Sequence, residues 1–197
     1  LQSLHERSGA SIAYYGTAEA GAAVVETFGE LGAEYAAIRK GCGLIDLPTR
    51  SIIEVRGGDR HTFLNRMVTQ ELKGVAPFAW RPSFWLNRKG RIDADLRIIE
   101  LGDITLLDVD VLAAKRTVET LGAFIIADDV ELRDVSGDLC RLVLHGPSAA
   151  GVVAAVSTPG AGPAVGELKH RGACEAAIGS ARIRIFRPGR IGFVNAL

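Results

Sequence analysis

Four charged residues alternate with apolar ones in one short stretch of the chain: Arg91, Asp93, Asp95 and Arg97. Side chains of a β-strand point to its two faces in turn, so a regular strand would place all four on one face. The two carboxylates would then lie about 7 Å apart. They could bind an amine-rich heterocycle by accepting hydrogen bonds from its ring N–H groups. The alternative, which this stretch alone favours, is a solvated face with cross-strand ion pairs.

Aromatic residues gather just before this stretch. The cluster comprises Phe78, Trp80, Phe84 and Trp85. Its simplest explanation is packing in the core. Its nearness to the strand of Asp95 would also allow a flat ligand to stack there, so we take Trp85 and Arg97 as candidate ligand neighbours.

Other kinds of catalytic or metal site have weaker support. The four histidines show no HExxH or other ligand spacing: His5, His61, His145 and His170. Three cysteines without a CxxC pair indicate reduced thiols of a cytoplasmic protein: Cys42, Cys140 and Cys174. The sequence contains neither a GxSxG elbow nor a GxGxxG loop. We therefore expect no metal site and no phosphate-cradling loop.

The elements that must position these residues follow from periodicity and turn signals. Residues 84–86 and 91–99 are predicted strands, and residues 87–90 between them form a hairpin turn in which Gly90 supplies a positive φ. Further strands are predicted at residues 44–47, 51–56, 104–109, 130–133, 139–144 and 182–186. We expect the first of these to be buried.

Helices are predicted at three places, residues 34–40, 115–121 and 148–156, and a fourth begins after Asp59 as its N-cap. That fourth helix carries an apolar stripe made of Phe63, Leu64, Met67 and Val68. Residues 17–31 are predicted to be either a helix or a mobile, weakly packed segment, and residues 157–166 a loop. The order of elements predicts an α+β sandwich with helices on one face of an antiparallel sheet.

Composition narrows the class of protein. The chain has 197 residues, of which 48% are hydrophobic, and its 23 basic residues equal its 23 acidic ones. A neutral chain lacks the basic footprint of a nucleic-acid-binding protein. The sequence has no apolar run of about 18 residues, so we expect no membrane span. The chain starts without Met, which we interpret as a processed or partial product.

Five motifs, in order and spacing, resemble the glycine-cleavage T-protein (aminomethyltransferase) family. They lie at residues 35–46 (YAAIRKGCGLID), 55–64 (VRGGDRHTFL), 86–96 (LNRKGRIDADL), 142–147 (LVLHGP) and 186–193 (FRPGRIGF). The resemblance implies an α+β, T-protein-like folate-binding fold without the C-terminal barrel domain. Residues 51–135 would be a ferredoxin-like antiparallel unit, and residues 1–50 with 136–197 a discontinuous β-rich unit.

The resemblance also implies a function. In this family tetrahydrofolate receives an aminomethyl group from the lipoyl arm of a carrier protein, ammonia leaves, and methylene-tetrahydrofolate forms. Asp95 matches the carboxylate that orients and activates the folate amine. Arg187 has two equally supported interpretations: it faces the glutamate tail of the folate, or it belongs to an ordinary surface turn. The residues expected to bind the cofactor are Trp85, Asp93, Asp95, Arg97, Val109, Asp110 and Arg187.

The sequence departs from the family at three places. Pro82 replaces a Tyr, Val109 replaces a folate-contacting Asn, and residues 188–192 lack the Tyr and Glu of the family segment. Two functions follow: an aminomethyl (one-carbon) transferase, or a non-catalytic folate-binding accessory protein such as an iron–sulfur-assembly relative. The departures favour the second function, and Asp95 is compatible with both. A third interpretation is an inactive domain fragment.

Overall fold

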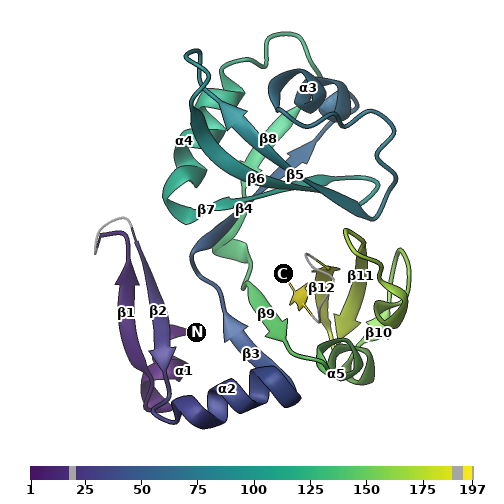
Figure 1. The fold of residues 1–197 in the computed structure, drawn as a ribbon. Helices are drawn as coiled ribbons and strands as arrows, with labels where there is room; N and C mark the ends of the chain where they lie inside the picture. Colours follow the sequence, from purple (N-terminus) through teal and green to yellow (C-terminus); the bar gives the residue numbers. More distant parts are fainter. Residues whose placement is uncertain (18–20, 188–192, 197) are drawn as a thin grey trace. The chain divides into compact units, whose positions relative to one another are not determined.

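The computed structural model describes residues 1–17, 21–187 and 193–196 of the chain. The chain divides into two compact units, one continuous and one discontinuous. Unit 2 comprises Arg50–Leu139, and unit 1 comprises Leu1–Thr49 together with Cys140–Leu197. Figure 1 shows the elements of each unit along the chain.

Unit 2 is a five-stranded antiparallel sheet with the strand order β5-β6-β7-β4-β8. Its strands are β4 (Arg50–Arg56), β5 (Ala79–Leu86), β6 (Ile92–Glu100), β7 (Thr105–Asp110) and β8 (Glu131–Asp134). Its helices are α3 (Arg60–Met67), α4 (Val111–Gly122) and the short 3₁₀ helix η1 (Ser136–Asp138).

Both α-helices of unit 2 pack on the same face of this sheet. Phe63 of α3 and Leu121 of α4 share one core with Val55, Leu96 and Leu107 of the strands, and all five are fully buried. Leu96 alternates with the polar residues Asp95 and Arg97, as expected where one face of a sheet is covered. In the central strand β7, by contrast, Leu106 beside Leu107 is also fully buried. The opposite face is the one that carries Asp95.

Unit 1 contains a hairpin and a six-stranded antiparallel sheet. The hairpin joins β1 (Ser11–Tyr15) to β2 (Ala22–Thr27), and the sheet has the order β10-β11-β12-β13-β9-β3. The sheet strands are β3 (Gly43–Asp46), β9 (Leu142–His145), β10 (Thr158–Pro159), β11 (Ala173–Ile178), β12 (Ala181–Phe186) and β13 (Phe193–Ala196). The helices are α1 (Gln2–Arg7), α2 (Leu31–Lys40), α5 (Ala149–Val156) and the 3₁₀ helix η2 (Val165–Glu167).

Most of the predicted elements are present, and three predictions are wrong. Residues 22–27 form a strand instead of a helix or loose segment, because β2 pairs with β1 along its length. Strand β3 is not buried, since Leu44 is 64% exposed. The predicted loop 157–166 contains β10 and the first two residues of η2. Strand β11, which pairs with β12, was not predicted.

The hairpin turn between β5 and β6 has the predicted chemistry. Gly90 has a φ of +71°, and its N–H donates to the carbonyl of Asn87 at 2.9 Å. The side-chain Oδ1 of Asn87 accepts from the backbone N–H groups of Lys89 and Arg91. An Asn side chain that binds the following backbone stabilises such turns. The turn therefore fixes where β6 starts.

Helix α3 begins after Asp59, as predicted, but this residue does not cap it with its side chain. The carboxylate of Asp59 instead accepts a hydrogen bond from the backbone N–H of Asp129 at 2.9 Å. Asp59 therefore ties the loop before β8 to the start of α3.

Candidate functional site

Asp95 lies exposed on the helix-free face of the unit 2 sheet, directly opposite Phe84 of β5. Among the residues that the structure describes, its carboxylate has no hydrogen-bond or ion-pair partner. Phe84 is 41% exposed. The sequence had placed Phe84 in an aromatic cluster only, because its position opposite Asp95 depends on the register between β5 and β6.

Asp93 lies in different surroundings from Asp95, because β6 has a bulge at Asp93. Trp85 pairs with Ala94, whereas the next residue, Leu86, pairs with Ile92, so Asp93 is an extra residue on β6. Its carboxylate accepts from Asn87 Nδ2 at 3.0 Å and pairs with Arg116 of α4 at 3.4 Å. The predicted alignment of Asp93 with Asp95 on one face is therefore wrong.

Trp85 and Val109 lie in the core on the helix-covered face. Trp85 is 5% exposed, its indole N–H donates to Thr120 Oγ1 at 3.1 Å, and its ring meets Phe124 edge-on. Val109 is fully buried in the same core. The structure thus corrects the expected position of Trp85 beside Asp95, since the sheet separates its ring from that carboxylate.

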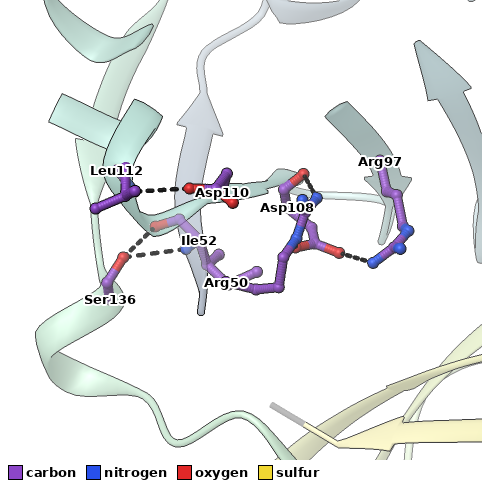
Figure 2. A network of polar contacts seen from close by, with 7 residues as sticks. All are labelled: Arg50, Ile52, Arg97, Asp108, Asp110, Leu112 and Ser136. Carbon is purple, nitrogen blue, oxygen red and sulfur yellow. Dashed lines mark hydrogen bonds and ion pairs between the residues drawn. The ribbon is translucent and has the colours of Figure 1, made fainter. Parts of the chain in front are cut away.

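Arg97 takes part in a polar network that includes Asp108 of the neighbouring strand β7 and Arg50 of β4, the strand beyond β7 (Figure 2). Its Nη1 donates to Asp108 Oδ2 at 2.9 Å, and Arg50 Nε donates to Asp108 Oδ1 at 2.8 Å. The carboxylate of Asp108 is fully buried between these two guanidinium groups. Neither Asp108 nor Arg50 was identified from the sequence as a site residue. A signal for Asp108 was available, because acidic and apolar residues alternate around Val109 at the end of β7.

Asp110 has a structural role at the start of α4. Its Oδ1 accepts from the backbone N–H of Leu112 at 2.9 Å, which caps the helix (Figure 2). Arg187, in unit 1, donates from Nη1 to the carbonyl of Leu168 at 2.7 Å. The predicted turn that follows Arg187, residues 188–192, lies outside the described residues.

Unit 1 contains a separate, mostly apolar cavity of about 600 Å³. Leu4, Phe28 and Ile38 line it, together with the pair formed by His5 Nε2 and Asp46 Oδ2 at 3.0 Å. This cavity contains none of the site residues predicted from the sequence.

Two kinds of feature are absent from residues 1–17, 21–187 and 193–196. Within them, no group of three or more His, Cys, Asp or Glu side chains is arranged to hold a metal ion. No helix of the described part is long and apolar enough to cross a membrane.

Known proteins resemble the chain over nearly all of its length. The family model "GCVT N-terminal domain" matches residues 1–196. An aminomethyltransferase of Synechococcus sp. (strain CC9311) is 25% identical over 176 residues, which cover 85% of this chain and 46% of that protein. An aminomethyltransferase of Geobacillus kaustophilus (strain HTA426) is 29% identical over 150 residues, which cover 76% of this chain and 40% of that protein. The chain thus spans less than half the length of these curated relatives.

Solved structures resemble the fold as well. The glycine cleavage system aminomethyltransferase T from Bartonella henselae matches with a TM-score of 0.81 and 25% identity, over 99% of this chain and 52% of that one. The heterotetrameric sarcosine oxidase from Corynebacterium sp. U-96 matches with a TM-score of 0.57 and 19% identity, over 85% and 83% of the two chains. The second likeness concerns the fold alone.

Proposed function

Because the chain belongs to the GCVT N-terminal domain family, we propose that it serves tetrahydrofolate-dependent aminomethyl transfer, with Asp95 as the key carboxylate. One observation carries this proposal: Asp95 is an exposed carboxylate with no partner among the described residues. The relatives described above are named aminomethyltransferases. None of these names favours the alternative of a non-catalytic accessory protein.

The charges around Asp95 support its role as an acceptor for a ligand. Arg97, two residues further along β6, directs its guanidinium group to Asp108, and Arg50 does the same from β4. These two cations and the buried Asp108 stabilise one another, so Asp95 remains available to accept hydrogen bonds from a bound molecule. A carboxylate that is exposed on a rigid strand can hold an N–H group in a fixed direction.

Asp95 fits a reduced folate on chemical grounds. Tetrahydrofolate, when bound, would supply the ring and bridging nitrogens that accept the one-carbon unit. Asp95 would accept a hydrogen bond from one of these nitrogens and stabilise the positive charge that develops there. The same proposal includes a lipoyl carrier protein as the source of the aminomethyl group, and a cytoplasmic location.

Titration of the purified chain with tetrahydrofolate by calorimetry tests the proposal. We expect saturable binding, and no binding by the chain would overturn it. A second experiment adds an aminomethyl-loaded lipoyl carrier and measures methylene-tetrahydrofolate. Formation of this product supports the transferase function. Folate binding without product would support a folate-binding role and contradict catalysis by this chain.

A further inference from the structure

Phe84 is an unusually exposed aromatic residue for its strand. The two tryptophans of β5, Trp80 and Trp85, are each 5% exposed, whereas Phe84 between them is 41% exposed. Removing a large apolar side chain from water is energetically favourable. Phe84 therefore offers an apolar contact surface next to Asp95 that the described core does not use.

Hydrogen bonds hold the backbone of Phe84 in place. Its N–H donates to Thr69 Oγ1 at 3.0 Å, and its carbonyl accepts from the N–H of Thr69 at 3.1 Å. These backbone groups therefore point away from β6, which makes Phe84 and Asp95 a non-hydrogen-bonded pair of the ladder. Side chains of such pairs lie closest together, with Cβ atoms about 4.5–5.5 Å apart.

We propose that Phe84 forms the stacking surface for the flat ring of the ligand whose edge Asp95 binds. The proposal rests on the proposed function, in which that ligand is a reduced folate. The face of the Phe84 ring can pack against a planar heterocycle, while the neighbouring carboxylate accepts hydrogen bonds from N–H groups at the edge of that heterocycle. The two side chains together would select molecules that are flat and rich in N–H donors.

Substitutions at Phe84 separate stacking from simple apolar contact. Phe84→Tyr keeps the flat ring and should bind tetrahydrofolate within about twofold of the original chain. Phe84→Leu keeps apolar surface without a flat ring and should bind about fivefold more weakly. Phe84→Ala should bind about tenfold more weakly, as for loss of an aromatic stacking partner. Ile92→Ala is the control, because Ile92 is 59% exposed on the same hairpin but lies beyond the bulge.

Calorimetric titration with tetrahydrofolate, with circular dichroism to confirm that each variant is folded, gives distinct outcomes. The expected result is the order Phe, Tyr, Leu, Ala with Ile92→Ala unchanged. Equal affinities of the original chain and Phe84→Leu would overturn the stacking role and leave the proposed function intact. An equal loss in Ile92→Ala would also overturn it, because the effect would then not be specific to Phe84. Failure of the original chain to bind would overturn both proposals.

A double-mutant cycle adds a readout of shared contact. If Phe84 and Asp95 contact the same ring, the combined Phe84→Leu and Asp95→Asn substitutions should weaken binding less than the product of the two single effects. Strict multiplication of the two effects would contradict contact with one ring.

Discussion

Arg50 binds Asp108 twice: its Nε donates to Oδ1 of the carboxylate, and its Nη2 donates to the backbone carbonyl, each at 2.8 Å. Arg50 is the first residue of β4, and Asp108 lies in the neighbouring strand β7. The pair therefore fastens the start of unit 2 to the middle of its sheet. Arg97 completes the arrangement from the other side of Asp108.

Removal of the Asp108 carboxylate should strongly destabilise unit 2. Asp108→Ala leaves the guanidinium group of Arg50, which is only 13% exposed, without its counter-charge. Loss of one partner from a buried ion pair lowers the free energy of unfolding by about 3–5 kcal/mol. Urea denaturation measures the change.

The matched control is the surface pair of Arg133 and Asp138, whose side chains are 60% and 68% exposed. Asp138→Ala should change the free energy of unfolding by less than about 1 kcal/mol, because exposed ion pairs contribute little. Equal effects of the two substitutions would refute the assigned role of Asp108.

Asp95 and Asp93 should differ in their effects on ligand binding. Asp95→Asn should weaken tetrahydrofolate binding about tenfold or more, because a hydrogen bond to a charged group contributes about 1.5–3 kcal/mol. Asp93→Asn should leave affinity nearly unchanged, since Asn87 and Arg116 already occupy that carboxylate. Calorimetry on both variants decides the matter, and a larger effect at Asp93 would speak against the assignment.

Cys174 should make stability depend on pH in the alkaline range. Burial, with a smaller effect of the Glu175 carboxylate, raises the pKa of the Cys174 thiol from 9.0 to about 11. Between these values the unfolded chain releases the thiol proton while the folded chain keeps it, so stability falls as pH rises. Below pH 9 the contribution is complete.

Denaturation curves from pH 8 to pH 11 test this dependence. The original chain should lose more stability over this range than Cys174→Ala, and parallel pH dependences would contradict the raised pKa. A labelling reagent at pH 8 should meanwhile modify exposed Cys140 much faster than buried Cys174.

Gly146 occupies a position that disfavours any residue with a Cβ atom. Its φ is +136°, and a Cβ atom there would lie 2.3 Å from the carbonyl oxygen of Gly41. Gly146→Ala should therefore lower the free energy of unfolding by about 1–3 kcal/mol from backbone strain alone. Thermal denaturation provides the measurement.

Gly151, in α5, is the matched control because nothing lies within 4 Å of the Cβ that alanine would add. Gly151→Ala should stabilise the chain by about 0.5–1 kcal/mol through helix propensity. A loss of stability in this variant would show that the local packing differs from the one described.

Much of the fold could be predicted from local signals. The turn at residues 87–90, strand β6 and helices α2 and α5 have clear periodicity or turn residues, and the structure has them within about three residues of the predicted bounds. Strand β5 and helix α4 are present as predicted but begin earlier, at Ala79 and Val111. The structural match to a glycine cleavage aminomethyltransferase confirms the predicted T-protein-like fold. Strand β2 was missed because its alanines and valines suit a helix as well as a strand, and only pairing with β1 decides.

The site was harder to predict, because it depends on register. Simple alternation grouped Asp93 with Asp95, and one extra residue in β6 separates them. The same register decides that Phe84, and not Trp85, lies opposite Asp95. Ion pairs between residues distant in sequence, such as Arg50 and Asp108, can be identified only when the order of strands is known.

The insertion of unit 2 within unit 1 has a consequence for the order of assembly on the ribosome. Residue 139 completes unit 2, and its two ends already meet there, since the N–H of Val135 donates to the carbonyl of Ile52 at 3.0 Å. Strand β3, by contrast, must wait for β9, which is synthesised about a hundred residues later. Because the chain is synthesised from its N-terminus, the sheet of unit 2 can form before the rest of unit 1 exists. Once formed, unit 2 shortens the loop between the two segments of unit 1, so that these segments can pair.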